Sequence, residues 1–538
     1  MAQMKTPGVY IVEKNASPNP VVEVPTAIPA FIGITEKAVN GADSLRGKPW
    51  KITSMTEFLQ YFGGAPVLKF TLSVVDKLKT GEEASFYSIP SIDGTKILKV
   101  DKPVNLFSLY YHMVMFFANG GSTCYIVSTG TYSEGKPIDK EMVTEALSAL
   151  EKEREVTLVL VPEAAFTGDC KDIQQSVIAH CGKMKNRFAI LDIQSKAKDN
   201  EPQSEQIETF RTNVGTNFLS YGAAYYPWLN TSVLSDKDID GTVMTWDYAK
   251  VTDDYLSAFF DSESGLLGYF KTVSEEIVKG KKTVIQEKTG EDGKTVLGID
   301  GKAETEAVEV SLTDDELIAM KNNLHNVLLQ NMPGYRYLVN KVKTKLNLLP
   351  PSAAMAGIYT MVDNTRGVWK APANMSVNCA YSSAEDIDNS MQEDLNMPID
   401  GKAVNVIRTF SGEGIKVWGA RTLDGNSLDW RYVNTRRTMM FLEESVKNVV
   451  KAYASELNTA NTWISVKSKI DDFLRSVWKR GGLAGAMPED AYEVHVGLGD
   501  TMTADDMLNG IMRVTVLVAI TRPAEFIEIT FQQQMQKS

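Results

Sequence analysis

Two apolar stretches, "EVTLVLVPE" (155–163) and "RFAILDI" (187–193), determine the fold class expected for this chain. Each is rich in aliphatic residues and follows a segment whose apolar residues recur at helical spacing. A further segment of this kind, 205–216, leads into the run "FLSYGAAYYPWL" (218–229). Buried strands that alternate with helices predict an α/β unit with a mainly parallel sheet.

Both ends of the chain have the sequence pattern of β-strands. Within "PAEFIEITFQQQMQKS" (523–538), the residues Ile527, Ile529 and Phe531 fall on one face, and polar residues fall on the other, which is the period of a half-buried strand. Near the N-terminus, Val9 to Val12 are apolar on both faces. A terminal strand without a neighbour is a template for pairing with another chain, so the partner of these strands is an open question.

Length and charge exclude several classes of protein. The chain has 538 residues, too many for one compact core, so two to four domains are expected. The most apolar run, "VTVLVAI" (514–520), is far too short to span a bilayer, and the N-terminus has no signal-peptide pattern, so folding in the cytosol without membrane insertion is expected. A net charge of −12 opposes nucleic acid as a partner.

The chain contains no recognisable phosphate-binding or nucleophile motif. The loops after the predicted strands have neither G-x-G-x-x-G nor G-x-x-x-x-G-K-[ST], and no G-x-S-x-G elbow occurs. The glycines of "SGEGIKVWG" (411–419) are interpreted as a hairpin turn between two strands. The four cysteines form no C-x-x-C pair and predict buried free thiols.

Metal and acid–base chemistry are also not indicated. His180 and Cys181, with Asp169 and Cys170 upstream, match no zinc spacing. Adjacent carboxylates such as Asp471 and Asp472 point in different directions on a helix. We therefore assign no catalytic, cofactor-binding or metal residue and expect no enzyme. An α/β enzyme with an unrecognised ligand site in the middle domain is the alternative.

The region 231–345 has a less regular sequence pattern than its neighbours and is interpreted as an inserted, outward-facing module. Within it, 279–302 predicts a solvated hairpin with Gly-Glu-Asp-Gly at its tip, followed by a helix that begins in "SLTDDELIAM" (311–320). After residue 350 the sequence predicts two strands, two helices and two final strands.

The helix predicted over 462–480 has one apolar face, formed by Val466, Ile470, Phe473, Leu474, Val477 and Trp478. The opposite face carries charges of both signs, among them Lys467, Lys469, Arg475 and Lys479. This face is available either for water or for a partner.

Several motifs, taken in order, resemble the contractile tail sheath proteins of bacteriophages and related contractile injection systems. They are "TPGVYIVE" (6–13), "AFIGITE" (30–36), "TSMTEFLQYFGG" (53–64), "PPSAAMAGIYTMVDNTRGVWKAPAN" (350–374), "GIKVWGARTL" (414–423), "WRYVNTRRTMMFLEESV" (430–446), "FLRSVWKRGGLAGAMPEDAYEVHVG" (473–497) and "VTVLVAITRPAEFIEITF" (514–531). The region 231–345 matches nothing in that family. Because one chain carries both the N-terminal and the C-terminal portions, the resemblance favours the phage or extracellular type over the two-chain type VI sheath.

The resemblance implies a multidomain α/β and α+β architecture, with a β-rich C-terminal sheath domain completed by exchanged terminal strands, an α/β middle domain and an inserted outer module. The resemblance implies five parts. They are an N-terminal arm (1–25), a conserved inner sheath domain (26–100 with 346–524), a middle domain (101–230), an inserted domain (231–345) and a donated C-terminal strand (525–538).

The implied function is that of a structural subunit that polymerises around an inner tube and contracts to drive the tube through a target envelope. The implied strand-exchange residues are Val9, Tyr10, Ile11, Val12, Phe526, Ile527, Ile529 and Phe531. The implied tube-facing residues are Lys467, Lys469, Arg475 and Lys479. The expected partners are further copies of the chain, the inner tube protein, and baseplate and terminal cap proteins. Assembly is expected in the bacterial cytoplasm, as part of a phage tail or an injection particle.

Overall fold

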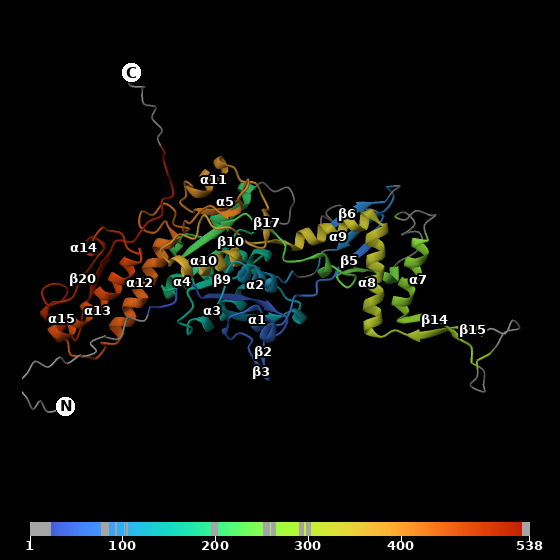
Figure 1. Ribbon diagram of the computed structural model, residues 1–538, viewed down its shortest axis with the longest axis horizontal. Helices are drawn as coiled ribbons and strands as arrows, with labels where there is room; N and C mark the ends of the chain where they lie inside the picture. The colour runs from blue at the N-terminus through green and yellow to red at the C-terminus, as the bar shows by residue number, and fades with distance from the viewer. Residues whose placement is uncertain are drawn as a thin grey trace, which may run out of the picture.

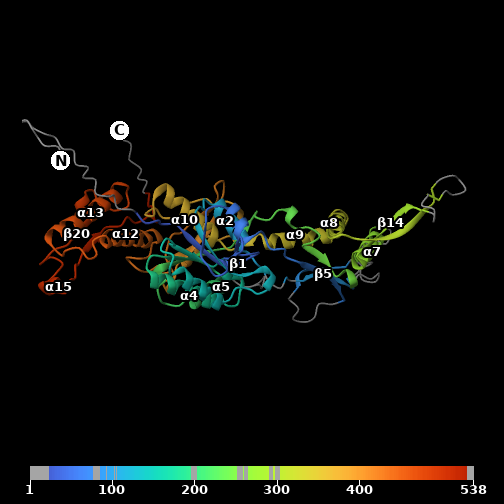
Figure 2. The same ribbon diagram turned by 90° about the horizontal axis from the view of Figure 1, so that it is seen from below.

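The computed structural model is elongated, with three parts arranged along its long axis (Figure 1). A C-terminal lobe lies at one end, a sheet with its covering helices lies in the middle, and a distal lobe with a protruding hairpin lies at the other end, as the view from below also shows (Figure 2). No helix among the described residues is both long and apolar enough to cross a membrane. The structure describes residues 23–76, 85–91, 94–101, 103, 106–194, 203–250, 259, 265–289, 295–296 and 303–529.

The middle part is built on an eight-stranded sheet with the order β19-β18-β11-β10-β9-β1-β8-β4. The inner strands pair in parallel, and the edge strands β4 and β19 pair antiparallel with β8 and β18. In that order the strands are Gly414–Val417, Val404–Phe410, Gly222–Tyr226, Phe188–Asp192, Leu158–Leu160, Pro29–Thr35, Cys124–Thr131 and Trp50–Ile52. The predicted alternation of apolar strands and helices with a mainly parallel sheet is therefore confirmed. The glycines of 411–419 also form the predicted hairpin, since Phe410 pairs with Gly414.

The strand order differs from the domain division inferred from the sequence. Strand β1 lies between β8 and β9, and β18 follows β11, although β1 and β18 were assigned to the inner domain and their neighbours to the middle domain. Residues on both sides of position 101 thus share one sheet. The reason is physical: parallel strands are joined by long crossovers, so neighbours in the sheet are distant in sequence, and local patterns do not encode their order.

Helices cover both faces of this sheet. One face is covered by α3 (Lys140–Leu150), α4 (Cys170–Met184) and α5 (Gln203–Asn213), and the other by α2 (Leu109–Ala118) and α10 (Ser352–Arg366). Side chains of β1 alternate between the two cores, with Phe31 packed among those of α2 and with Ile32 on the side of α3 and α4. A strand buried on both faces is expected to be a nearly continuous apolar run, as β1 is from Pro29 to Ile34.

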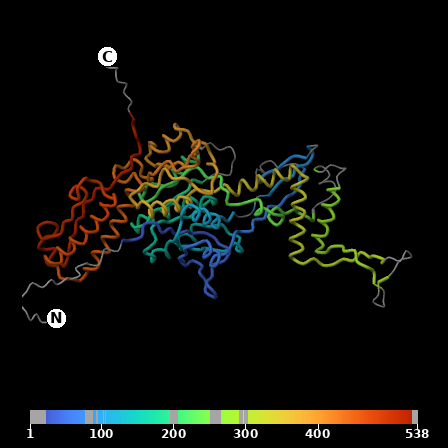
Figure 3. Tube along the Cα trace, viewed as in Figure 1, coloured from blue at the N-terminus to red at the C-terminus, as the bar shows by residue number. Residues whose placement is uncertain are grey.

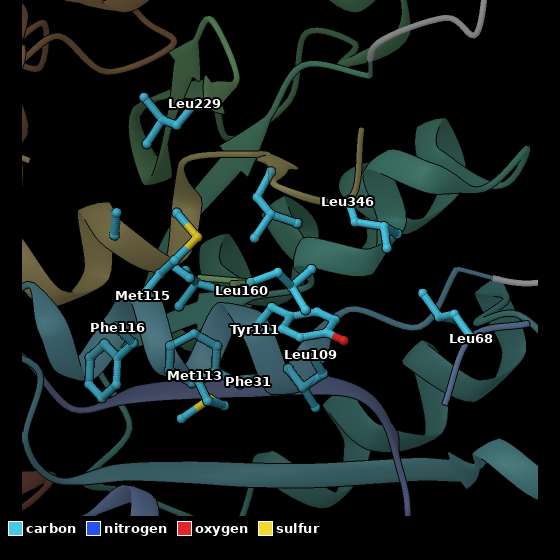
Figure 4. Close-up of a cluster of buried hydrophobic side chains, with 14 of the residues drawn as sticks. Phe31, Leu68, Leu109, Tyr111, Met113, Met115, Phe116, Leu160, Leu229 and Leu346 are labelled. Atoms are coloured by element: carbon cyan, nitrogen blue, oxygen red, sulfur yellow. The ribbon is translucent and has the colours of Figure 1, made fainter. Parts of the chain in front are cut away.

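The core beneath α2 and α10 is tightly packed (Figure 4). Phe31 of β1 meets Phe116 of α2 edge to face, with ring centroids 5.0 Å apart. Gly357 of α10 allows the two helices to approach, because a Cβ at that position would lie 2.5 Å from the carbonyl oxygen of Phe116. The helix predicted within 53–64 is α1 (Met55–Phe62), and Ser54 caps it by accepting a hydrogen bond from the backbone N–H of Glu57.

The distal lobe contains a second sheet, with the order β13-β5-β7-β6. These strands are Met244–Trp246, Phe70–Val75, Ile97–Asp101 and Ser85–Pro90, and three helices accompany them: α7 (Leu266–Lys279), α8 (Asp314–Asn331) and α9 (Pro333–Leu346). Strands β5, β6 and β7 therefore lie with the predicted insertion 231–345 and not with the inner domain, because β5 pairs with β13 and β7, and β7 pairs with β6. The helix expected in 311–320 is α8, which begins with a capping box of Thr313 and Glu316.

The predicted hairpin at 279–302 is longer than its sequence pattern indicates. Strand β14 (Lys281–Glu287) pairs with β15 (Thr305–Ser311), which lies beyond the predicted range. A bridge between Thr289 and Thr295 occurs inside the range, and the residues of the predicted tip lie outside the described part of the chain. The hairpin projects from the distal lobe (Figure 1).

The C-terminal lobe consists of helices packed on a small sheet. Helices α12 (Val433–Lys451) and α13 (Ala460–Lys479) pack on β20 (Tyr492–His495) and β21 (Thr515–Val518), with the short helices α14 (Pro488–Ala491) and α15 (Ala504–Leu508) between these strands in sequence. The predicted helix 462–480 is α13, and its apolar face is buried as expected, with Trp478 half-buried.

Smaller elements connect these parts. Helix α11 (Asn389–Asn396) packs on β18. The remaining strands are β2 (Val39–Asn40), β3 (Asp43–Ser44), β12 (Leu229–Thr231), β16 (Leu348–Leu349) and β17 (Ala380–Ser383). The 3-10 turns are η1 (Tyr132–Glu134), η2 (Pro162–Phe166), η3 (Leu219–Tyr221), η4 (Asp236–Asp238) and η5 (Tyr248–Lys250).

Candidate functional site

The small sheet of the C-terminal lobe is incomplete as a folding unit. It has two strands, β20 and β21, which pair antiparallel from Tyr492 with Val518 to His495 with Thr515. Each strand of a two-stranded sheet keeps one edge of unpaired N–H and C=O groups, and such a pair is marginal without further strands or packing. One face of this sheet packs on α12 and α13, while Leu517 on the other face is 53% exposed.

An open groove of about 1020 Å³ lies between α12 and β21. Its walls are largely apolar and include Leu442, Val446 and Val450 of the helix and Val516 and Val518 of the strand. A groove beside a strand with an unpaired edge offers backbone hydrogen bonds and apolar contact together. These are the two requirements for adding an extended peptide to a sheet.

The N-terminal arm meets the body at the C-terminal lobe. Glu23 forms an ion pair with Arg480 of the turn after α13, and the backbone N–H of Val24 donates to Ser445 of α12. The guanidinium of Arg437 donates to the carbonyl oxygen of Thr26 at 2.9 Å. The predicted exchange residues Val9, Tyr10, Ile11 and Val12 precede this attachment and lie outside the described residues.

The C-terminal arm leaves the body at Glu525. Its carboxylate accepts hydrogen bonds from Nε and Nη2 of Arg421, from the hydroxyl of Tyr432 and from Nδ2 of Asn396, all at 2.7 or 2.8 Å. Burial alone would raise the pKa of Glu525, but these hydrogen bonds and the charge of Arg421 hold that pKa below its usual value. Residues 526–529, which follow it, lead away from the body (Figure 3).

The described residues of the predicted C-terminal strand are exposed in this single chain. Phe526, Ile527 and Ile529 are 71%, 78% and 70% exposed, and they form no strand here. Phe531 lies outside the described residues. Three large apolar side chains exposed to water within one short segment are typical of a site that another protein surface covers.

Three of the four predicted tube-facing residues are exposed on α13. These are Lys467, Arg475 and Lys479. Lys469 is half-buried instead, with its ammonium 5.0 Å from the centre of the Tyr453 ring, and therefore lies at the margin of the α13 outer face. The outer face also carries Ile464, which is 67% exposed.

Two buried carboxylates at the ends of central strands would be candidates for an enzyme site. Glu163 follows β9, and its oxygens accept hydrogen bonds from the backbone N–H groups of Ile34, Ser108 and Leu109, at the start of α2. Burial raises the pKa of Glu163 to about 7, against the opposing effect of these three donors. This carboxylate ties α2 to the sheet and is not presented to a ligand.

Asp192 at the end of β10 has the same role for α10. Its two oxygens accept from the backbone N–H and the hydroxyl of Ser352, at 2.8 and 2.5 Å. Burial raises the pKa of Asp192 to about 7, and the bonds from Ser352 oppose that shift. No local sequence pattern marks either acid, because their burial and their hydrogen-bond partners depend on contacts between residues at least 54 positions apart.

The remaining candidates for metal or thiol chemistry have structural surroundings. The Nε2 atom of His180 lies 2.9 Å from a guanidinium nitrogen of Arg187. The four cysteines are free thiols, and Cys124, Cys170 and Cys181 are buried, whereas Cys379, which was also expected to be buried, is partly exposed. Within the described ranges, no group of three His, Cys, Asp or Glu residues is arranged to hold a metal ion.

Comparison with known proteins shows which family the C-terminal lobe resembles. Residues 426–534 match the model of the phage tail sheath C-terminal domain family. This part of the chain is therefore similar to the contractile tail sheath proteins. Its relatives include the tail sheath proteins of Vibrio phage KVP40, 24% identical over 153 residues, and of Salmonella phage ViI, 23% identical over 150 residues. These matches cover 28% of this chain and only 22% and 24% of the two phage proteins.

The likeness to solved sheath structures extends over the whole chain. The sheath complex of the extracellular contractile injection system PVC, in its contracted state, is 25% identical with a TM-score of 0.56, and the match covers 99% of both chains. The helical sheath of the anti-feeding prophage, also contracted, is 23% identical with a TM-score of 0.56 and matches 99% of this chain and 100% of that chain. The mixed α/β architecture is therefore that of a sheath protein.

Proposed function

We propose that this chain is the repeating subunit of a contractile helical sheath. The observation that carries the proposal is the likeness in fold along the full chain to a contracted injection-system sheath, together with the phage tail sheath C-terminal domain at 426–534. In this function the chain polymerises around an inner tube and contracts to drive the tube through a target envelope. It performs no bond chemistry.

The subunits are joined by exchanged strands. Val9 to Val12 and Phe526 to Phe531 are the donated segments, and the β20–β21 sheet with its groove is the acceptor. The support for this is the coincidence of a sheet with only two strands among the described residues, an apolar groove beside it, and an exposed segment with strand alternation. Each backbone hydrogen bond contributes only about 1 kcal/mol net, but several strands per subunit make a continuous mesh.

The polymer is helical and has two packings. Strand donation from one subunit to the next is a heterologous contact that does not close on itself, and such contacts generate helical filaments. An extended arrangement held by the inner tube and a compact arrangement with more contact between subunits differ in free energy. Release of the first lets the sheath fall into the second, which moves the tube.

The outer face of α13 is the surface for the inner tube. Lys467, Arg475 and Lys479 are exposed there, and Lys469 at its margin is the weakest of the four candidates because its ammonium already lies over Tyr453. Exposed charges give contacts that salt screens, which suits an interface that must release during contraction.

The distal lobe faces outward in the sheath. It lies at the end of the molecule opposite the C-terminal lobe, so the two ends meet different surroundings when the C-terminal lobe packs around the tube (Figure 1). The further partners are a baseplate and a terminal cap. The sheath is assembled in the bacterial cytoplasm as part of a phage tail or an injection particle.

Electron microscopy of the purified chain tests the proposal. We expect hollow cylinders of uniform width with a helical surface pattern, in the contracted state because no tube is present to hold the extended one. Compact single particles at every protein concentration would contradict the proposal and direct attention to ligand screening of the central sheet.

A further inference from the structure

The hydrogen bonds at Glu525 form a clamp, which comprises Glu525, Arg421, Tyr432 and Asn396. The guanidinium of Arg421 holds both carboxylate oxygens of Glu525 in a bidentate pair, at 2.8 and 2.7 Å. The side chain of Arg421 is 2% exposed and that of Glu525 is 19% exposed. Such a pair is geometrically restrictive, because its two parallel bonds fix both direction and distance.

The clamp is connected to the central sheet by short hydrogen bonds. Asn405 of β18 accepts from the backbone N–H of Arg421 at 2.6 Å and donates to its carbonyl oxygen at 2.7 Å. The same amide also donates to the carbonyl oxygen of Ala224 in β11, at 3.2 Å. Arg421 is thus held in place by two neighbouring strands of the most buried part of the molecule.

Within the described part of the arm, contact with its own body is made at the clamp. The three apolar residues among 526–529 are at least 70% exposed, and residues 526–529 form no side-chain hydrogen bond or ion pair with the described body. A segment fixed at one residue and free immediately beyond it is a tether with a defined origin.

We propose that Arg421, with Tyr432 and Asn396, anchors the origin of the C-terminal arm through Glu525, so that the arm is aimed at the neighbouring subunit and its tension passes into the central sheet. This inference rests on the proposed sheath function and adds the positioning residues of the donated arm. The residue that does the anchoring lies in the body, and the residue that is anchored starts the arm.

The anchor acts by reducing the freedom of the donated segment. When one end of a short tether is fixed near its target, the other end searches a smaller volume and its effective concentration rises. When the origin of the arm is released, the arm must be ordered from a larger conformational ensemble. The additional entropic cost weakens every contact between subunits. A second consequence is mechanical. Tension on the arm is borne first by the bidentate ion pair of Arg421 and Glu525, before it reaches the rest of the C-terminal segment.

The test compares matched variants of the full chain. E525A removes the clamp, and the double variant R421M/E525Q removes it without leaving a buried charge unpaired. E528A is the control, because Glu528 is an exposed glutamate three residues further along the same arm. The critical concentration for polymerisation is measured by pelleting, at a temperature where circular dichroism shows every variant folded.

We expect E525A and R421M/E525Q to raise the critical concentration at least ten-fold and E528A to change it less than two-fold. A merely structural role of Glu525 would lower the unfolding temperature but leave the critical concentration of the folded chain unchanged. If E525A does not fold, the double variant decides the question.

A deletion of 525–538 separates this inference from the proposed function. If the deletion blocks polymerisation while both clamp variants behave like E528A, the anchor is wrong and strand donation stands. If the deletion polymerises normally, the C-terminal arm is not donated, and the anchor has no role.

Discussion

At the residue scale, one buried ion pair fastens the C-terminal lobe to the middle of the molecule. Arg437 of α12 donates from Nη1 and Nη2 to the two carboxylate oxygens of Asp363 in α10, at 3.0 and 2.6 Å. Their side chains are 3% and 1% exposed, and the guanidinium lies 4.6 Å from the centre of the Tyr359 ring. The pair therefore links two helices that belong to different parts of the fold.

Replacement of Asp363 by alanine should destabilise the chain strongly. The change leaves the Arg437 charge buried without its counterion, which costs about 3–5 kcal/mol in the free energy of unfolding. Denaturant unfolding measures this loss. The matched control is Lys51→Ala, which breaks an exposed ion pair with Glu155 and should cost less than about 1 kcal/mol. Equal losses in the two variants would contradict the structural role of the buried pair.

The buried carboxylate Asp192 should make stability depend on pH. Burial raises its pKa from the ordinary value of 3.8 to about 7 in the folded chain, so the folded state keeps a proton that the unfolded state has lost between these pH values. Stability from this group is therefore complete below pH 3.8 and falls as pH rises toward 7, by at most about 1.4 kcal/mol per pH unit.

Asp192→Asn mimics the protonated form, because its amide can keep both contacts with Ser352. We expect the variant to gain stability over the natural chain as pH rises from 5 to 8 in urea unfolding. A difference that does not change with pH would show that Asp192 titrates normally.

At the scale of elements, the α12–β21 groove and the β14–β15 hairpin have opposite expected roles. The groove lies in the lobe that matches the phage tail sheath C-terminal domain, and it is apolar and open. The hairpin projects from the other end of the molecule (Figure 1), and its first and last strand pairs join Lys281 with Ser311 and Glu287 with Thr305. We expect the α12–β21 groove to be essential for assembly and the β14–β15 hairpin to be dispensable.

A charge in the groove should block assembly of a folded chain. Val446→Asp places a carboxylate among apolar walls that a donated strand must cover, and desolvating it is costly. Pelleting should show loss of polymer, while the thermal unfolding of the monomer changes little because Val446 is half-buried. Asn448→Asp adds the same charge to an exposed position of α12 outside the groove and should polymerise normally. Polymer formed by the Val446 variant would contradict the acceptor role of the groove.

Removal of the hairpin should leave assembly intact. Residues 281–311 can be replaced by a short Gly-Ser loop, because the backbone N–H of Leu312 already bonds to the carbonyl oxygen of Gly280 at 2.9 Å. We expect cylinders of normal width in electron micrographs, with less density at the outer surface. A failure to assemble would show that the hairpin contacts a neighbouring subunit.

At the scale of the whole molecule, the two arms attach to different parts of one elongated body. The N-terminal arm is held by the C-terminal lobe through Arg480 and Ser445, and the C-terminal arm is held beside the central sheet through Arg421. In the proposed sheath, a subunit that receives strands at its C-terminal lobe, and donates one arm from that lobe and one from beside the central sheet, links several neighbours at once. This arrangement suits a mesh that changes pitch without separating.

Removal of 525–538 should give a folded monomer that does not polymerise. The deleted segment contributes exposed apolar side chains to its own chain and no regular structure in its described part, so its loss costs the fold little beyond the clamp. Size-exclusion chromatography with circular dichroism checks both properties. Filaments of normal length from this deletion would contradict strand donation.

The sequence by itself determined the identity of the elements, because helix and strand periods are local properties of the chain. The strands at 158–160 and 188–192, the buried face of α13 and the alternation after Glu525 all followed from spacing alone. Only the tertiary structure decided which elements are neighbours. It placed β1 between β8 and β9 and moved strands β5, β6 and β7 to the distal lobe.

The clamp and the buried acids show the same limit. Arg421 and Glu525 are 104 residues apart, and Glu163 meets Ser108 across 55 residues. Their partnership and pKa shifts arise from burial and from hydrogen bonds that close only when the chain has folded. No periodicity in the sequence records such contacts, so the residues that position the arm were found from the tertiary structure, whereas the arm itself was predicted from its sequence.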